Sequence, residues 1–195
     1  MTAFILTLLV AATTTGADLL NRMAERYSQA SGFQWTLQSE VYSSVFEETE
    51  TTPVEFAFNS PDTFYFKSEH EEVIGIADTV WIMSKRHKQI QKKISTAYIM
   101  PSDLIIGWSD RYDLDDYGIK GDLNEFILTG KEEISPADVR IKSKRNNHLH
   151  SIFYRDTMGN DVTLTVKKEK LARTENINIF FKNIPKGYKL IDLTE

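Results

Sequence analysis

Apolar and polar residues alternate along most of the chain after Gly32, and this period of two constrains the fold more than any other feature. Phe33, Trp35 and Leu37, for example, are separated by polar residues. Such alternation is typical of strands with one buried side and one solvent-facing side. We predict strands of this kind around residues 33–37, 54–58, 64–66, 139–141, 162–166 and 177–181. The chain is therefore expected to be mainly β, with neighbouring strands antiparallel.

Residues 18–30 follow a helical period instead, because Leu19, Leu20, Met23 and Tyr27 fall on one helical face and charged residues on the other. Asp18 is the expected N-cap of this amphipathic helix. Pro101 to Trp108 predicts a second, short helix that is apolar on most of its surface. We expect it to pack over the mouth or the inner side of the sheet. The fold class is thus mainly β with a few short helices (α+β).

The chain begins with an apolar run, Phe4 to Ala12, which is followed by small residues. It is shorter than the roughly 20 apolar residues that span a bilayer, and it resembles the core of a secretory signal peptide. We therefore expect residues 1–17 to be a signal peptide and residues 18–195 to form a single exported domain. Neither a linker nor an internal repeat divides this second segment.

Composition and missing motifs exclude several classes of function. The net charge of −5 disfavours sequence-blind binding to nucleic acid, which needs clustered Lys and Arg. No cysteine is present, so disulfides, thiolate metal sites and lipidation of a mature N-terminal cysteine are excluded. The sequence also lacks the nucleophile elbow, zincin, P-loop and dinucleotide-binding motifs. We expect neither an enzyme nor a cofactor.

Polar clusters give only weak candidates for chemistry. His148 and His150 could hold a metal if a third ligand approached, but their spacing indicates none, so we predict no metal site. The carboxylates Glu69, Glu71 and Glu72 surround His70 at what we interpret as a solvated hairpin tip. Basic stretches near residues 85–93, 142–145 and 167–173 are expected to be solvated strand faces, or else contacts for anionic head groups or an acidic partner.

Large aromatic residues collect on one predicted strand face. This set comprises Trp35, Phe56, Phe58, Phe64 and Phe66. Ordinary core packing explains any one of them, but a single sheet with few helices has little else to cover so broad an apolar face. Either the sheet folds into a sandwich or this face lines a cavity that accepts an apolar ligand.

Several short motifs occur in an order that resembles the LolA family, periplasmic carriers of outer-membrane lipoproteins. Between Val54 and Ile94 they are the turn proline Pro61, the aromatic strand with Phe64, the turn Ala77-Asp78-Thr79, and Trp81 followed by Gln89. Two further segments, Glu125 to Lys131 and Phe180 to Leu193, are similar to the family's later strands. The likeness spans nearly the whole predicted domain. One position departs from it, because Ser60 stands where many members have an Arg that holds the lid shut.

The resemblance implies an incomplete antiparallel β-barrel (half-barrel) covered by a helical lid, with residues 101–108 as one lid element. It further implies a monomeric carrier that shuttles acylated lipoproteins through the periplasm, from an inner-membrane lipoprotein-releasing transporter toward the outer membrane, where a receptor is a further candidate partner. The alternative is a related lipid-binding or sensor module of the same fold. The residues expected to line the cavity and lid are Trp35, Phe56, Phe58, Phe64, Phe66, Ile76, Trp81, Leu104, Ile105 and Phe181.

Overall fold

The computed structural model describes residues 14–59, 63–94, 100–132, 134–173 and 185–194, and shows a mostly β protein with two helices. The helices are α1 (Gly16–Ser28) and α2 (Trp108–Arg111). The strands are β1 (Gly32–Ser43), β2 (Glu48–Asn59), β3 (Thr63–Lys67), β4 (Glu71–Ile76), β5 (Thr79–Ser84), β6 (Gln89–Ile94), β7 (Tyr112–Lys120), β8 (Leu123–Gly130), β9 (Asp138–Lys144), β10 (Leu149–Arg155), β11 (Asp161–Lys170) and β12 (Lys189–Leu193).

All twelve strands belong to one sheet, in the order β12-β6-β5-β4-β3-β2-β1-β11-β10-β9-β8-β7. Neighbouring strands are antiparallel except β12, which pairs parallel to β6. The order ends at β12 and β7, so the sheet is open, in keeping with the predicted incomplete barrel. The strand expected at residues 177–181 and Phe181 itself lie outside the described residues. Most of the predicted export segment, residues 1–17, also lies outside the described residues.

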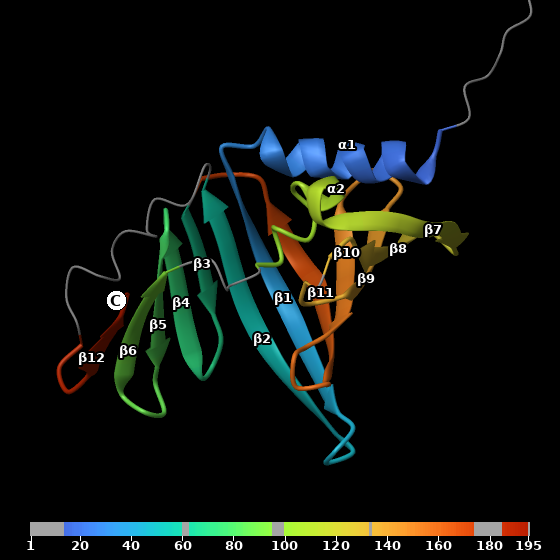
Figure 1. Cartoon of the computed structure of the whole chain (residues 1–195). Helices are drawn as coiled ribbons and strands as arrows, with labels where there is room; N and C mark the ends of the chain where they lie inside the picture. The colour runs from blue at the N-terminus through green and yellow to red at the C-terminus, as the bar shows by residue number, and fades with distance from the viewer. Residues whose placement is uncertain (1–13, 60–62, 95–99, 133, 174–184, 195) are drawn as a thin grey trace, which may run out of the picture.

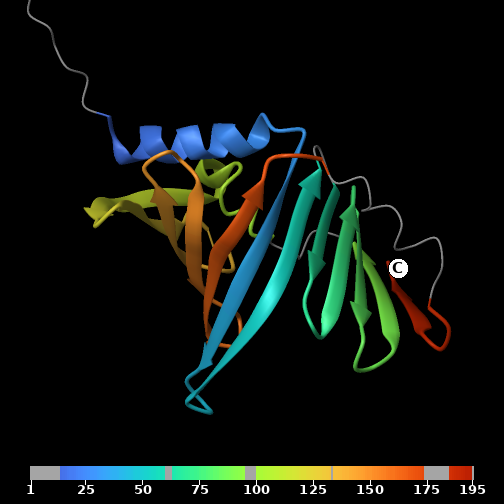
Figure 2. The ribbon, with the colours of Figure 1, turned by 180° about the vertical axis from the view of Figure 1, so that it is seen from behind.

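Helix α1 lies across one end of the sheet (Figures 1 and 2). Its N-cap is Thr15, not the predicted Asp18. Thr15 and Asp18 form a capping box, in which each side chain accepts a hydrogen bond from the other residue's backbone N–H. This box begins the helix two residues before the predicted start, so Gly16 and Ala17 are helical. None of the helices among the described residues is long and apolar enough to cross a membrane.

The predicted helix at 101–108 is mostly not a helix. Residues 101–107 form a series of turns, and the single-turn helix α2 begins only at Trp108. The backbone N–H groups of Asp103 and Ile105 donate to the carbonyls of Met100 and Ser102, three residues earlier, which is the hydrogen-bond pattern of tight turns rather than of an α-helix. Gly107 then adopts a left-handed conformation with φ of 72°, which ends the turns before α2. The predicted burial is confirmed, because Leu104, Ile105 and Trp108 are all buried.

The strand register divides the sheet into two faces. On one face the cross-strand partners are Trp35 and Phe56, then Phe56 and Phe66, then Phe66 and Val73. This face, which we call the inner face, packs with α1 and residues 100–108 in the main hydrophobic core. The opposite, outer face holds a second small cluster of Ala57, Tyr65 and Ile74. The open sheet therefore buries one face under a helix and a run of turns.

Candidate apolar binding site on the inner face

The inner face carries a continuous group of aromatic side chains beneath α1. Trp35 and Phe56 are buried, and their ring centroids lie 5.4 Å apart in a stacked arrangement. Phe58, Phe64 and Phe66 are partly buried and pack against the same core. The prediction that these five residues share one face is confirmed by the strand register.

Leu104 and Ile105 cover this face from the run of turns. Their exposed fractions are 2% and 0%, and both belong to the main core. The adjoining Trp108 donates a hydrogen bond from its indole Nε1 to the Asn21 side-chain oxygen of α1 at 3.0 Å. Residues 100–108 and α1 therefore form one connected cover over the inner face.

Two predicted cavity residues lie on the wrong side of the sheet. Trp81 pairs with Ile74, and Ile76 pairs with Thr79, so Trp81 and Ile76 belong to the outer face. Strands β4 and β5 have apolar residues at successive positions, so their sequence does not distinguish one face from the other. The prediction that Trp81 and Ile76 line the same face as Trp35 is wrong for this reason.

A pocket of about 460 Å³ lies on the inner face beside the start of the covering turns. We call it the inner-face pocket; its apolar lining is Val41, Phe66, Met100, Tyr154, Val162 and Leu164, together with Pro101 and Pro136. Its polar lining is Ser39, Glu71, Ser135, Asp156 and Thr157. This volume lies within the range of small-molecule sites. Of the predicted cavity residues only Phe66 lines it.

Sequence reasoning missed most of the apolar lining, although one signal was available. Val162 and Leu164 alternate with polar residues in β11, and the register pairs Leu164 with Ile152 on the inner face. That alternation predicts the buried face of β11 but does not indicate where the cover leaves a space. The contributions of Met100 and Pro136 depend on tertiary packing alone.

Glu71 is the polar lining residue whose environment differs most from the prediction. The hairpin tip is formed by residues 68–70, and the Ser68 backbone N–H donates to the Glu71 carbonyl at 2.8 Å. Glu71 is therefore the first residue of β4 rather than part of a solvated tip. Burial raises the pKa of its carboxyl above the ordinary value, and the charge of His70 offsets part of this effect.

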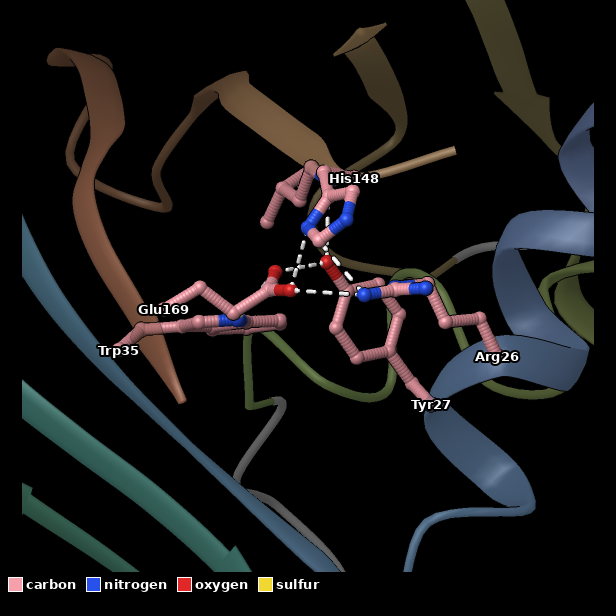
Figure 3. A network of polar contacts seen from close by, with 6 residues as sticks. Arg26, Tyr27, Trp35, His148 and Glu169 are labelled. Atoms are coloured by element: carbon pink, nitrogen blue, oxygen red, sulfur yellow. Dashed lines mark hydrogen bonds and ion pairs between the residues drawn. The ribbon is translucent and has the colours of Figure 1, made fainter. Parts of the chain in front are cut away.

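A network of polar contacts fastens α1 to the sheet at the other end of the inner face (Figure 3). Its centre is the carboxylate of Glu169, which accepts hydrogen bonds from the Tyr27 hydroxyl and from Trp35 Nε1, the latter at 3.3 Å. Arg26 and His148 lie within 3.5 and 2.6 Å of the same carboxylate. Burial, and next the hydrogen bond to Glu169, raise the pKa of Tyr27 far above its ordinary value.

This network also accounts for one of the two histidines considered as metal ligands. His148 contacts Glu169. For His150, burial and next the charges of Lys144, Lys142 and Lys167 lower the pKa of the imidazole. Among the described residues, no group of three or more His, Asp or Glu side chains could hold a metal ion.

Comparison with known proteins identifies relatives by structure only. No protein-family model matches the sequence, and no curated protein matches it. The fold is similar to the crystal structure of an uncharacterized conserved protein from Thermus thermophilus, with 15% identity and a TM-score of 0.56, over 91% of this chain and 99% of that one. This likeness shows a shared fold and nothing about activity.

The chain is also similar to a LolA superfamily protein from Nitrosomonas europaea, the superfamily that the sequence resembles. The identity is 11% and the TM-score 0.49, and the match covers 84% of this chain and 96% of that chain.

Proposed function

We propose that this chain is a carrier that holds the acyl chains of a lipidated ligand against its inner face and releases them without chemical change. The observation that carries this proposal is the inner-face pocket, a space of about 460 Å³ with a mainly apolar lining between the sheet and residues 100–101. The sequence resemblance to the lipoprotein carriers of the LolA family supports the same function.

Apolar contact alone gives useful affinity in such a site. Each buried methylene contributes about 0.8 kcal/mol, so about ten methylenes contribute about 8 kcal/mol, which offsets a large part of the entropic cost of association. Release then requires only a competing apolar surface on an acceptor. No nucleophile or general base has to act on the ligand.

The proposal assigns residues 100–108 and α2 the role of a lid. Leu104 and Ile105 occupy the inner face above the aromatic residues, so a longer acyl chain gains space when these side chains move away. The acyl chain then contacts the aromatic side chains of Trp35, Phe56, Phe58 and Phe64. Phe66 already lines the pocket and would contact the ligand first. Ser60 lies outside the described residues, so the lid is held in this proposal by contacts such as that between Trp108 and Asn21.

The same proposal places the protein in the periplasm after removal of the N-terminal segment, between a lipoprotein-releasing transporter and an acceptor in the outer membrane. These partners are inferred from the sequence resemblance and from the apolar run at Phe4 to Ala12. A related lipid-binding or sensor module is the alternative. It would bind a ligand at the same face but would not deliver it to a second membrane.

Displacement of a fluorescent fatty acid tests the carrier proposal directly. The purified protein should bind the probe and lose it to an acylated peptide, but not to the same peptide without acyl chains. Leu164→Trp should fill the pocket and weaken binding at least tenfold, because Leu164 points into the pocket. Thr163→Trp is the matched control, since Thr163 lies on the outer face of the same strand.

The folded state of both variants is checked by thermal unfolding, and native mass spectrometry of wild-type protein from the periplasm provides an independent measurement. Absence of probe binding by the wild type, together with no co-purified lipid or lipoprotein, would refute the carrier. Equal displacement by acylated and unacylated peptide would favour a protein-binding module instead.

A further inference from the structure

The lining of the inner-face pocket contains both apolar and acidic side chains. Val41, Val162 and Leu164 provide an apolar wall on β1 and β11, while Glu71 and Asp156 add two carboxylates. A purely hydrocarbon ligand needs no carboxylate, and leaving one beside apolar groups is unfavourable unless it is paired. The lining therefore suits an amphipathic ligand whose polar group has a preferred position.

Asp156 is already fully engaged by its own turn. Its carboxylate accepts hydrogen bonds from the backbone N–H groups of Met158 and Asn160 at 2.8 and 2.9 Å and from Asn160 Nδ2 at 3.0 Å. These contacts explain Asp156 as a structural residue of the loop between β10 and β11. They leave Glu71 as the carboxylate of the pocket that still requires an explanation.

Three cations lie near Glu71 in the sequence or in the sheet, and of these Lys67 is on the outer face, opposite Glu72. The other two, His70 and Lys85, contact other carboxylates. His70 lies 3.4 Å from Glu50, and Lys85 lies 3.2 Å from Glu72 while it also donates to the Ser68 carbonyl. Within the described parts of the chain, no Lys, Arg or His forms an ion pair with Glu71. The Glu71 carboxylate is thus partly desolvated and forms no ion pair, and the charge of His70, which offsets only part of the desolvation, belongs to a side chain that contacts Glu50.

The fold directs Glu71 toward the pocket. Glu71 and Val73 are two residues apart in β4, and Val73 pairs with Phe66 on the inner face. Side chains two residues apart share a face of a strand, so Glu71 occupies an inner-face position at the start of β4. Its neighbour Glu72 lies on the outer face, opposite Met83. The acidic group in the pocket is therefore fixed by strand geometry.

We propose that the inner-face pocket takes an acylated ligand that carries a protonated amine next to its acyl chains, with the ammonium at Glu71 and the chains against Val162 and Leu164. This inference rests on the carrier proposal and specifies its ligand. Two kinds of molecule have this chemistry: a diacylated peptide with a free N-terminal amine, and a phospholipid with an amine head group. An ammonium supplies the charge-assisted hydrogen bonds that a partly buried carboxylate favours.

Matched ligand pairs that differ only in the charge of the amine test the proposal. The first pair is an S-diacylglyceryl-cysteine peptide with an uncharged tail and its N-acetyl derivative. The second is phosphatidylethanolamine and its N-acetyl derivative. Affinities are measured by displacement of a fluorescent fatty acid at pH 7.0, where an α-amine with a pKa of about 7.7–8.0 is mostly protonated.

In the wild type, the charged member of at least one pair should bind about tenfold more tightly, as expected for a hydrogen bond to a charged group. Glu71→Gln should reduce this preference to less than about twofold while neutral ligands bind as before. Glu69→Gln is the matched control, because Glu69 is exposed at the hairpin tip and does not line the pocket. It should retain the full preference.

The possible results separate this inference from the carrier proposal. Preference within one pair identifies the source of the amine and supports the inference. Equal binding of charged and acetylated ligands in both pairs overturns it and leaves the carrier intact, as does a preference that persists in Glu71→Gln. If none of the four ligands displaces the probe, both the inference and the carrier proposal fail.

Discussion

The hydroxyl of Tyr27 donates a hydrogen bond to the carboxylate of Glu169, and this contact joins α1 to β11. The same hydroxyl accepts a hydrogen bond from the backbone N–H of Leu149 at 2.9 Å. Tyr27 is fully buried, so one phenol satisfies groups from two strands at the point where the helix crosses the sheet. The position of the helix over the inner face therefore depends on a polar contact as well as on apolar packing.

Tyr27→Phe should consequently destabilise the protein. The change removes the acceptor of the buried Leu149 N–H and a donor to Glu169, at a cost of about 1–3 kcal/mol in the free energy of unfolding. Urea unfolding measures this loss. Tyr42→Phe is the control, because Tyr42 is 41% exposed, and it should change stability by less than about 0.5 kcal/mol. Equal stability of both variants would contradict a structural role for the Tyr27 hydroxyl.

Gly16→Ala should prevent close packing at the start of α1. A Cβ at position 16 would lie 2.5 Å from Tyr117 Cβ and 2.6 Å from Tyr117 Cγ, which is closer than any normal contact. The helix or β7 must shift, at an expected cost of about 1–3 kcal/mol. Gly118→Ala in β7 is the control, because a Cβ at position 118 would have no other atom within 4 Å among the described residues. Thermal unfolding should show a lower midpoint for Gly16→Ala only.

The faces of β1 and β11 could be predicted from sequence because one side of each strand is apolar and the other polar. Phe33, Trp35 and Leu37 are all buried, as their alternation indicates. The same reasoning fails for β4, where Val73 and Ile74 are both buried on opposite faces. A strand with apolar residues on both faces gives no register signal, and for this reason Trp81 and Ile76 were misplaced.

The candidate site was harder to predict than the sheet, because it depends on the exact positions of the hairpin tip between β3 and β4 and of the turns at residues 101–107. Glu71 faces the pocket because its hairpin tip ends at His70, and a shift of one residue would have directed it to the outer face. Met100 reaches the pocket through the turns that replace the expected helix. Local sequence signals specify neither the end of a hairpin nor the packing of a covering loop to within one residue.

Glu71→Gln should increase stability at neutral and alkaline pH. Because burial raises the pKa of Glu71 in the folded protein, the folded state binds this proton more tightly than the unfolded chain does. Ionisation of Glu71 therefore lowers the free energy of unfolding. This loss is absent below the ordinary pKa of 4.5, grows as pH rises, and is complete above the folded-state pKa. The gain from Glu71→Gln should therefore be present at pH 8 and vanish near pH 4.

Urea unfolding at several pH values measures this difference, and Glu69→Gln should show no comparable pH dependence. A loss of stability in Glu71→Gln at pH 8 would mean that the carboxylate is well solvated or paired in the folded protein. Higher stability combined with weaker binding of an amine-bearing ligand would be a trade-off between stability and function at one residue.

Asn21→Ala should accelerate ligand exchange if residues 100–108 act as a lid. The Asn21 side chain accepts the hydrogen bond from Trp108 Nε1 at 3.0 Å, and this is a direct polar link between α1 and α2. Opening the lid would break this bond, so its removal lowers the barrier in both directions while the dissociation constant changes less. A bond worth about 0.5–1.5 kcal/mol corresponds to an increase of about two- to tenfold in the entry and exit rates.

Stopped-flow measurements with a fluorescent fatty acid give both rates. Arg22→Ala changes the adjacent exposed residue of α1 and should leave them unchanged. Unaltered rates in Asn21→Ala would argue that the ligand enters the pocket without separation of α2 from α1.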